Sequence, residues 1–550
     1  MTAVARVEEL SRQLSKTNEA TEYDVLIIGS GLSGIYALYK ARQDGLRAKI
    51  IEAGSGEGGT WYWNRYPGAR FDSESYTYAF TFSQDLLDEW NWSEHFAAQP
   101  ETLRYIQYIV QRFDLTKDIQ FSTRIKSAHF QADSNSWLLT DDSSRVYTSR
   151  FLVTAIGLLN EPTLPDIPGV TCFRGKSFHT SRWPSAPIDL SNKRVGIIGT
   201  GATGIQVIQT IYKTVSSLTV YQRTANWTAP MHNSPISEEE MASIRRSYPS
   251  IFAKCASSPS GFVHNFIPRK TTDVPPAERE QIWESLFQQR SFAKWIGGFQ
   301  DLMTDPTANR LYSDFVARKI RERIHSPSVA DKLIPQDHGF GTRRVPLETE
   351  YYEAFNQPHV ELVDLHTNPI VSIHESGITT KAKSFDHDII IYATGFDAIT
   401  GSFDAIDMRG LDGLKLRDTW EPNIHTYLGM AVRGFPNMFM SLGPHQALGN
   451  IPRTIEPNVG WFMDLIKHCH ERGVERVEAT EEAERGWTEY VVELDGKLLG
   501  SQVDSWTTGV NRNLKHKQRR KVVRYGGSAV EYRRKIEEVK RRGYEGFVMS

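Results

Sequence analysis

Residues 23–34 read Tyr-Asp-Val-Leu-Ile-Ile-Gly-Ser-Gly-Leu-Ser-Gly, an apolar run followed by three closely spaced glycines. Its apolar run predicts a buried parallel strand, and residues 35–43 predict a helix. The glycines between them, Gly29, Gly31 and Gly34, have the spacing G-x-G-x-x-G. In a nucleotide-binding turn the first glycine allows the tight turn, the second lets the backbone approach a pyrophosphate, and the third lets helix and strand pack closely. The stretch therefore predicts an α/β domain that binds a dinucleotide.

The sequence that follows strengthens this prediction. A second strand is predicted at 48–52, and it ends in Glu52, which stands 18 residues after Gly34 and is placed to accept ribose hydroxyls. This context favours a nucleotide site over a simple glycine-rich turn. The next loop, 58–72, reads Gly-Gly-Thr-Trp-Tyr-Trp-Asn-Arg-Tyr-Pro-Gly-Ala-Arg-Phe-Asp, and its first four residues are common in FAD-binding domains. Its rings suit both the covering of an isoalloxazine and packing in a core.

The same glycine spacing occurs a second time, at Gly199, Gly201 and Gly204, after another apolar strand and before an expected helix. Where the first unit has its acid, the strand predicted at 217–224 has a glutamine and then Arg223, 19 residues after Gly204. A cation suits a 2′-phosphate, whereas an acid suits a free 2′-hydroxyl. This site is therefore expected to bind NADPH and not NADH. A solvated surface arginine is the alternative interpretation.

The composition bounds the class of protein. At 550 residues the chain has room for about two to four domains, and 39% hydrophobic and 24% charged residues fit a soluble globular enzyme. Lys+Arg (64) nearly balance Asp+Glu (66), so no nucleic-acid or membrane partner is expected. The three cysteines form no C-x-x-C pair, which argues against a disulfide reductase, and no metal is expected. The polar N-terminus is not a signal peptide, so a cytoplasmic location is expected, and its first ~20 residues predict a mobile arm.

The segment between the two fingerprints identifies a family. Residues 173–184 read Phe-Arg-Gly-Lys-Ser-Phe-His-Thr-Ser-Arg-Trp-Pro, the pattern F-x-G-x-x-x-H-x-x-x-W-P. This segment, together with the order of the fingerprints, the 58–72 loop and a later Ala-Thr-Gly strand, resembles the flavin-dependent (type I) Baeyer–Villiger monooxygenases over roughly residues 22–510. The similarity is greatest to members that act on cyclic and terpenoid ketones. The resemblance implies FAD, NADPH and O₂ as reactants, and conversion of a ketone to an ester or lactone through a C4a-peroxyflavin and a tetrahedral adduct.

The resemblance also implies roles for individual residues. The family's catalytic arginine falls on Arg344, and Asp72 matches the acid that orients it, although a structural ion pair is the alternative. An arginine suits this position because it stays protonated near neutral pH and can stabilise an oxyanion. Arg343 matches a basic contact to the 2′-phosphate beside Arg223, and Trp506 matches a mobile-loop tryptophan that touches the nicotinamide cofactor. The residues expected to bind the cofactors are Gly29, Gly31, Ser33, Gly34, Glu52, Thr60, Trp61, Tyr62, Trp63, Arg70, Asp72, Tyr78, Thr200, Gly201, Ala202, Thr203, Gly204, Ile205, Gln206, Arg223, Thr224, Arg343, Arg344 and Trp506.

Beyond Asn511 the chain departs from the related enzymes, which often continue Ile-Pro-Gly-Lys. Here residues 512–521 read Arg-Asn-Leu-Lys-His-Lys-Gln-Arg-Arg-Lys, which leaves open how the loop closes and which substrate it admits. A solvated face is the favoured interpretation of this basic run. His179 is interpreted as structural support at a linker. The ketone stays open among cyclic, terpenoid, aromatic and long-chain classes, and the basic run leaves a coenzyme A-linked ketone open as well.

We expect two Rossmann-like dinucleotide-binding domains with a helical insertion in the second. The FAD domain is assigned to residues 1–155 and 385–550, the NADPH domain to 156–228 and 334–384, and the insertion to 229–333. The insertion has amphipathic helical patterns and is expected to roof the substrate cleft.

The predicted strands at 151–157 and 385–395 mark where the chain leaves the first domain and returns to it. The loop 443–451 is expected to line the ketone pocket. The protein is expected to be a monomer or a homodimer. A flavin monooxygenase that oxidises nitrogen or sulfur is the alternative activity, and a non-catalytic flavoprotein is a further alternative.

Overall fold

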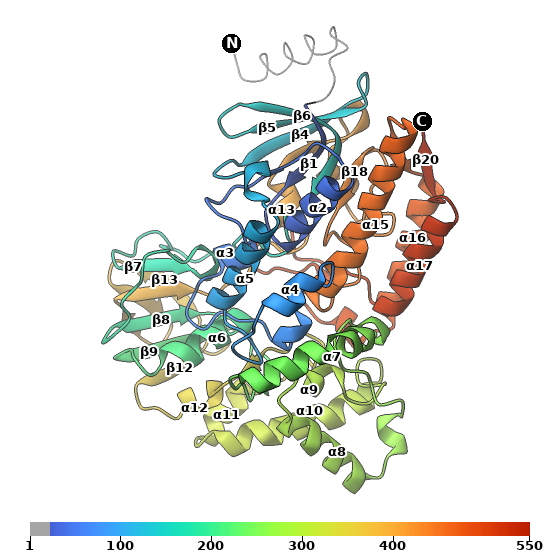
Figure 1. The fold of residues 1–550 in the computed structure, drawn as a ribbon. Helices are drawn as coiled ribbons and strands as arrows, with labels where there is room; N and C mark the ends of the chain where they lie inside the picture. Colours follow the sequence, from blue (N-terminus) through green and yellow to red (C-terminus); the bar gives the residue numbers. More distant parts are fainter. Residues whose placement is uncertain (1–21) are drawn as a thin grey trace.

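The computed structural model describes residues 22–550 and contains two separate large sheets and a group of helices (Figure 1). In the view of Figure 1 the first sheet lies at the top, the second at the left, and the helices of residues 229–333 at the bottom. The C-terminal helices, in orange and red, run down the right side. The polar arm predicted at the N-terminus lies outside the described residues. The fold class is α/β, as the sequence predicted.

The first sheet is built around the strand of the first fingerprint. Its central strand β1 (Tyr23–Ile28) pairs in parallel with β2 (Ala48–Ile51) and with β6 (Val146–Thr154). The glycine turn leads into α2 (Leu32–Gln43), and α15 (Ile451–Arg472) packs against that helix. The strand order is β17-β4-β5-β6-β1-β2-β3, and β18 also pairs with β6. The other strands are β3 (Ile119–Gln120), β4 (Ile125–Gln131), β5 (Ser136–Asp141), β17 (Asp407–Arg409) and β18 (Met438–Met440).

The turn between β1 and α2 needs glycine at two positions for different reasons. Gly29 has a φ of +102°, and a Cβ there would lie 2.5 Å from the carbonyl oxygen of Ala155. A Cβ on Gly34 would lie 1.9 Å from the carbonyl oxygen of Gly29. Glycine alone satisfies both requirements, because it tolerates a positive φ and has no side chain between the helix and the turn. The predicted roles of these two glycines are confirmed.

The second sheet repeats the same unit with five parallel strands, in the order β12-β9-β8-β16-β7. Its fingerprint connects β8 (Arg194–Ile198) to α6 (Ala202–Ile211), and β9 (Ser217–Gln222) follows. A small antiparallel sheet of β13, β14 and β15 is attached to this domain. The other strands are β7 (Lys176–His179), β12 (Val360–Asp364), β13 (Ile370–His374), β14 (Gly377–Thr380), β15 (Ser384–Asp386) and β16 (Ile389–Tyr392).

One strand lies in a different sheet from the one the sequence analysis assigned. The run 385–395 was placed in the FAD domain, but its strand β16 pairs in parallel with β8 and β7 in the second sheet. The chain therefore returns to the first domain after β16, so a boundary at 385 is wrong for this strand. A buried apolar strand that ends in a small residue and glycine fits either nucleotide-binding sheet, because both sheets need the same interior strand. The earlier strand β6 does lie in the first sheet, as expected.

Residues 229–333 are largely helical, as predicted. The side chain of Ser237 accepts a hydrogen bond from the backbone N–H of Glu240 at 3.1 Å and so caps α7. The apolar faces of these helices, which include Trp283 and Phe315, pack into the same core as the second sheet. The insertion is thus fixed to the second domain. Its helices are α7 (Glu238–Ser257), α8 (Pro276–Gln288), α9 (Ala293–Ile296), α10 (Pro306–Arg323) and α11 (Pro327–Leu333).

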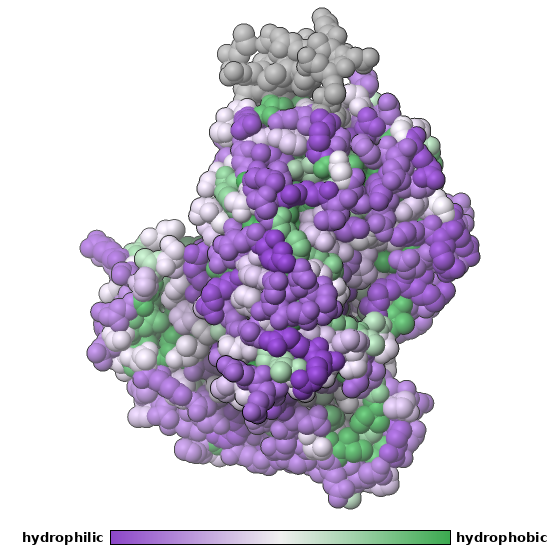
Figure 2. All heavy atoms as spheres, in the orientation of Figure 1, coloured by the Kyte–Doolittle hydropathy of each residue, from purple (hydrophilic) through white to green (hydrophobic). Residues whose placement is uncertain are grey.

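The molecular face in Figure 2 is mostly hydrophilic, and its apolar atoms are divided among separate groups. Among residues 22–550, no helix is both long enough and apolar enough to span a bilayer.

The remaining helices and short strands are α3 (Thr60–Trp63), α4 (Gln84–Glu89), α5 (Gln99–Arg112), α12 (Tyr351–Ala354), α13 (Gly401–Asp404), α14 (Leu416–Thr419), α16 (Glu481–Gly496), α17 (Ala529–Arg541), β10 (Ala229–Pro230), β11 (Leu347–Glu348), β19 (Val477–Ala479) and β20 (Phe547–Met549).

Candidate active site

A cavity of about 1630 Å³ is lined by both fingerprint turns, the helical insertion and the C-terminal segment. The loop 443–451 also contributes to its wall, as the sequence predicted. Most of the predicted site residues therefore meet at one place, although they come from distant parts of the chain. Those that line the cavity are Gly29, Gly31, Ser33, Glu52, Thr60, Trp61, Trp63, Arg70, Asp72, Tyr78, Thr200, Gly201, Ala202, Thr203, Gln206, Arg223, Thr224, Arg343, Arg344 and Trp506.

Four predicted residues do not line the cavity. Gly34 and Gly204 lie behind the fingerprint turns, where they let the helices pack closely. Ile205 is fully buried in the core of the second domain. The hydroxyl of Tyr62 accepts a hydrogen bond from the backbone N–H of Ser55 at 3.1 Å and lies 2.8 Å from its Oγ. Tyr62 therefore braces the preceding loop, and the structure does not place its ring where it could cover a flavin.

The first nucleotide end of the cavity has a fixed carboxylate. Glu52 is buried, and its Oε2 accepts hydrogen bonds from the backbone N–H (2.7 Å) and hydroxyl (2.9 Å) of Ser30. The backbone N–H of Gly54 donates to Oε1 at 2.6 Å. Carboxylate oxygens have further lone pairs, so this oriented group can still accept ribose hydroxyls. A Cβ on Gly59 would lie 2.7 Å from the Cα of Gly31, so the backbones form a narrow cradle that fits a pyrophosphate.

The aromatic loop after the first fingerprint both packs in the core and lines the cavity. The indole N–H of Trp61 donates to the Tyr78 hydroxyl at 3.1 Å, and Tyr78 stacks on Phe71 with ring centroids 4.5 Å apart. The guanidinium of Arg182, from the linker, lies 4.8 Å from the ring centroid of Trp63. Because these rings are held by neighbours, they offer a rigid surface to a planar cofactor such as the isoalloxazine.

The second nucleotide end of the cavity has a concentration of positive charge. Within residues 22–550, Arg223 has no hydrogen-bond or ion-pair partner, whereas Arg343 pairs with Asp337 at 3.3 Å. Desolvation lowers the pKa of Arg223, and the charges of Arg343 and Arg512 lower it further. A Cβ on Gly201 would meet no atom within 4 Å, so the turn itself is open. These features fit the phosphates of NADPH, since an anion would offset the repulsion between the cations.

The catalytic pair proposed from the sequence is formed. Arg344 Nη2 lies 2.7 Å from Asp72 Oδ2, and the two residues are 272 positions apart. The Asp72 side chain is 1% exposed, while that of Arg344 is 36% exposed. Burial raises the pKa of Asp72 above its usual value, and the charge of Arg344 opposes this rise. The carboxylate therefore holds one side of a guanidinium whose other nitrogens are accessible from the cavity.

A glutamine joins the two nucleotide domains beside this pair. The Tyr66 hydroxyl donates to Gln206 Oε1 at 2.7 Å, and Gln206 Nε2 donates to the carbonyl oxygen of Arg70 at 3.0 Å. Tyr66 and Arg70 belong to the aromatic loop of the first domain, and Gln206 lies in α6 of the second. Gln206 was predicted as a cofactor contact, and in the structure it also fixes the loop that ends in Asp72.

Sequence reasoning missed a second buried carboxylate just after this loop. Glu74 Oε1 accepts a hydrogen bond from His264 Nε2 at 2.6 Å and one from the backbone N–H of Phe292 at 3.0 Å. Burial alone would raise the pKa of Glu74, but His264 and the Phe292 amide lower it below its usual value. Glu74 thus ties the loop that carries Asp72 to the insertion. The spacing Asp-x-Glu after the aromatic loop is the signal that could have pointed to it.

His179 has the structural role that the sequence suggested. Its Nδ1 accepts from the backbone N–H of Ser181 at 3.2 Å, and its Nε2 lies 3.1 Å from the carbonyl oxygen of Gly395. Burial lowers the pKa of His179 to about 4, so the neutral ring donates through Nε2 at neutral pH. The histidine therefore connects the end of β7 to the loop after β16, at the junction of the domains.

The segment around Trp506 is folded against the cavity. Trp506 begins a 3₁₀ turn that the Ser505 side chain caps. Asp504, just before it, forms ion pairs with Arg520 at 2.8 Å and with Arg512. Further along, Lys521 pairs with Glu421 at 2.7 Å. The interpretation of the basic run as a solvated face is therefore only partly correct, because several of its cations fasten the segment to its surroundings.

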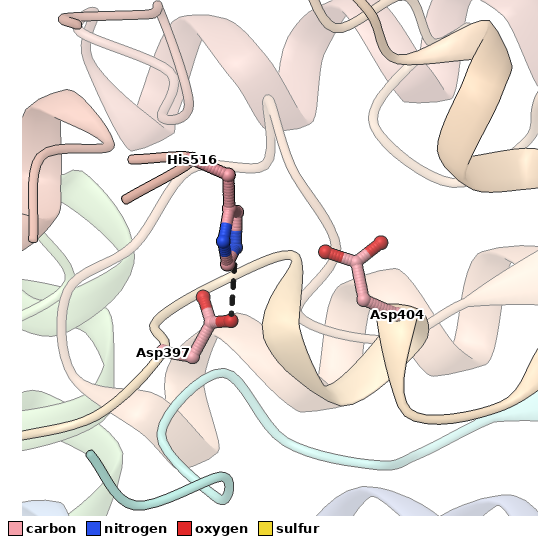
Figure 3. A group of neighbouring side chains, drawn as sticks. All are labelled: Asp397, Asp404 and His516. Carbon is pink, nitrogen blue, oxygen red and sulfur yellow. Dashed lines mark ion pairs between the residues drawn. The ribbon is translucent and has the colours of Figure 1, made fainter. Parts of the chain in front are cut away.

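Asp397, Asp404 and His516 converge beside this segment and have the residue types of a metal site (Figure 3). His516 Nε2 lies 3.6 Å from Asp397 Oδ2, and Lys517 also pairs with Asp397. Lys517 Nζ donates to the carbonyl oxygen of Ala398 at 3.0 Å as well. The ammonium group thus provides a cation within the cluster, which we interpret as an ion-pair network that holds the C-terminal segment.

Comparison with known proteins identifies the family. The family model described as pyridine nucleotide-disulphide oxidoreductase matches residues 26–257. A 2-oxo-Delta(3)-4,5,5-trimethylcyclopentenylacetyl-CoA monooxygenase of Pseudomonas putida is 41% identical over 545 residues, which cover 98% of this chain and 100% of the relative. A Baeyer–Villiger monooxygenase of Pseudooceanicola batsensis is 37% identical over 532 residues, 96% of each chain. The chain belongs to the Baeyer–Villiger monooxygenase family.

A solved structure supports the same assignment for the fold. The crystal structure of OTEMO in complex with FAD and NADP has a TM-score of 0.93 and 42% identity, and the match covers 97% of this chain and 100% of that chain. The Baeyer–Villiger fold of this protein therefore includes both nucleotide domains and the insertion. The pyridine nucleotide-disulphide oxidoreductase match reflects the shared nucleotide domains, because the three cysteines here are free and form no redox pair.

Proposed function

We propose that this protein is an FAD-containing monooxygenase that uses NADPH and O₂ to insert one oxygen atom next to a ketone carbonyl, giving an ester or lactone. The observation that carries the proposal is the ion pair of Arg344 and Asp72 in the wall of a cavity that also has two nucleotide-binding turns. The family membership supports the same reaction. Nitrogen or sulfur oxidation is the alternative. One relative, of Lysobacter antibioticus, is named as a phenazine N-monooxygenase and is 38% identical over 538 residues, but the relatives named for ketones favour the insertion next to a carbonyl.

The residues of the chain supply positioning and charge. The guanidinium of an arginine carries a positive charge, so Arg344 can stabilise negative charge on oxygen in the transition state. Asp72 orients the guanidinium and offsets part of the cost of its desolvation. When bound, FAD and NADPH supply hydride transfer and the activation of O₂. Trp506 and the segment that carries it cover the cavity and exclude water from the reacting groups.

The two cofactors have separate binding regions in this proposal. Glu52 and the cradle of Gly31 and Gly59 hold FAD at the first turn. Arg223 and Arg343 hold the 2′-phosphate of NADPH at the second turn. Thr200 supports that turn, because its Oγ1 donates to the carbonyl oxygen of Thr224 at 2.9 Å.

The substrate class is a cyclic ketone. The relatives include a monooxygenase named for a cyclopentenylacetyl-CoA, and others named for cyclohexanone and cyclopentanone. We infer that the enzyme works in the cytoplasm as a monomer or homodimer. Free cysteines and the use of NADPH support a reducing compartment.

The test is product analysis by mass after the purified holoenzyme is incubated with NADPH, ¹⁸O₂ and a panel of cyclic ketones. We expect products heavier than the ketone by one ¹⁸O atom, and their loss in Arg344→Ala with retained FAD. An amine and a sulfide are included in the panel. Oxygen transfer to these two but to no ketone would refute the proposal.

A further inference from the structure

The arginines that line the cavity are not equally neutralised. Nine arginines line it, and seven of these have a carboxylate, amide or backbone carbonyl oxygen at a terminal guanidinium nitrogen. The two whose terminal nitrogens have no acceptor within residues 22–550 are Arg223 and Arg524. Arg223 is already assigned to the cofactor phosphate. Arg524 is the cation that the proposed reaction leaves without a role.

The backbone on both sides of Arg524 is fixed to the loop of the ketone pocket. The carbonyl oxygen of Val523 accepts from the N–H of His445 at 3.2 Å, and the N–H of Tyr525 donates to the carbonyl oxygen of Gln446 at 3.3 Å. The side chains of Val523 and Tyr525 are buried in the core. Arg524 itself lies in a bend between these two anchored residues, and it lines the cavity.

The guanidinium of Arg524 is oriented from one side only. Its Nε lies 3.5 Å from Asp495 Oδ1, at the limit of a hydrogen bond, and the two terminal nitrogens donate to no described residue. The Asp495 side chain is 8% exposed, while that of Arg524 is 24% exposed. A weak contact through Nε leaves the terminal nitrogens free for a bidentate acceptor such as a carboxylate or phosphate.

Arg524 is also close to the loop of the catalytic arginine. A Cβ on Gly500 would lie 3.0 Å from Arg524 Nη2 and 3.0 Å from the carbonyl oxygen of Thr342. The absence of a side chain at Gly500 therefore lets Arg524 approach the loop that carries Arg344 two residues later. Arg344 and Arg524 both line the cavity, so a bound ketone can present its carbonyl to one arginine and a second, charged group to the other.

We propose that Arg524 binds an oxyanion carried by the ketone substrate, so that the preferred substrates are ketones with a carboxylate or a phosphate-bearing thioester. The proposal rests on the ketone monooxygenase function proposed above. It adds a substrate-positioning site that neither cofactor uses. A neutral ketone of the same size would make every other contact and lose this one.

The experiment compares three forms of one ketone with the holoenzyme: 2-oxocyclopentaneacetic acid, its methyl ester and its coenzyme A thioester. The variants are Arg524→Gln and Arg524→Lys, with Arg534→Gln as the matched control. Arg534 pairs with Glu531 and Glu538 on the exposed face of α17 and does not line the cavity. FAD content and thermal unfolding are measured first, so that a misfolded variant is recognised. The kcat/KM for oxygenated product is then measured by mass for each ketone.

We expect Arg524→Gln to lower kcat/KM for at least one anionic form about 10–100-fold, mainly through KM, and to leave the methyl ester within about threefold. Arg524→Lys should retain part of the preference for the anionic ketones over the methyl ester, and Arg534→Gln should retain all of it. Loss on the free acid assigns the carboxylate, and loss on the thioester alone assigns the phosphates. Titration of the flavin absorbance with each ketone, without NADPH, gives a Kd that should change in parallel.

Two outcomes would overturn the proposal. In the first, Arg524→Gln lowers kcat/KM for the acid, the thioester and the ester equally, which is expected if Arg524 only forms a structural ion pair with Asp495. In the second, the KM for NADPH rises while the ratio of acid to ester is unchanged, which assigns Arg524 to the cofactor. Failure of the wild-type enzyme to oxygenate any ketone, the ester included, would instead refute the proposed function.

Discussion

Replacing Asp72 by asparagine removes a charge from the catalytic pair without a change of shape. The Asp72 carboxylate is buried and accepts the hydrogen bond from Arg344, whereas the Arg344 side chain is 36% exposed. A charge-assisted hydrogen bond of this kind contributes about 1.5–3 kcal/mol. Because one partner is open to the cavity, we take about 2 kcal/mol, which corresponds to a loss of about 30-fold in kcat/KM for product formation. The asparagine amide can also turn its N–H₂ toward the guanidinium, which would add to the loss.

The assay separates the half reactions of Asp72→Asn. Flavin bleaching by NADPH in the absence of O₂ reports hydride transfer, and ester or lactone formed per NADPH consumed reports oxygen transfer. We expect oxygen transfer per NADPH to fall much more than the rate of flavin bleaching. The NADPH that gives no ester or lactone should then yield hydrogen peroxide. Asp464→Asn, in a partly exposed ion pair with Lys540 that lies outside the cavity, is the control and should behave as wild type. Product formation in Asp72→Asn within threefold of wild type would refute the positioning role, and an equal loss in both half reactions would assign Asp72 to NADPH binding.

Three further predictions test other parts of the structure. Arg223→Gln should raise KM for NADPH about 10–100-fold and leave KM for NADH within about threefold, as measured by steady-state kinetics; equal effects on both would contradict a 2′-phosphate contact. Gly34→Ala should lose bound FAD, measured by absorbance per protein, because the new Cβ would lie 1.9 Å from a carbonyl oxygen, whereas Gly496→Ala, where nothing lies within 4 Å, should retain it; equal retention would refute this account. The pKa of His179 is lowered to about 4, so protons bind first to the unfolded chain as pH falls. Its contribution to the free energy of unfolding, up to about 3 kcal/mol, is therefore present above pH ~6.5 and lost progressively down to pH ~4. Urea unfolding of wild type and His179→Asn should show a difference that shrinks over this window, and a constant difference would contradict it.

Local features were predictable from the sequence because their cause is local. A tight turn that needs a positive φ and a helix packed directly on it can only be made with glycine at fixed spacing, and both fingerprints have this requirement. The helices of the insertion were predicted from their periodicity and from caps such as Ser237 for the same reason. The pairing of Arg344 with Asp72 could not follow from local rules, since 272 positions separate them, and it came from the resemblance alone.

Other features depend on neighbours that are distant in the sequence and are brought close only by the fold. The strand at 385–395 has the same apolar pattern whichever nucleotide sheet contains it, so only the pairing of β16 with β8 decides. Tyr62 lies between two cavity-lining tryptophans in sequence, but a short helix turns its ring toward Ser55. Glu74 is one acid among 66 in the sequence, and its importance becomes visible only when His264 and the Phe292 amide enclose it.

The charge of a segment in the sequence is a poor guide to its net charge in the folded protein. The basic run of the C-terminal segment reads as one patch in the sequence, yet the fold neutralises its members individually: Arg520 by Asp504 and Lys521 by Glu421. Arg524, three residues beyond this run, keeps its terminal nitrogens free and lines the cavity. A guanidinium whose terminal nitrogens have no acceptor in a partly buried wall costs free energy in the empty enzyme. An anion that arrives with a ligand therefore gains more there than at an arginine whose terminal nitrogens are already paired. From these free terminal nitrogens we infer where the charges of the ligands lie: the cofactor phosphate at Arg223, and an anionic group of the substrate at Arg524.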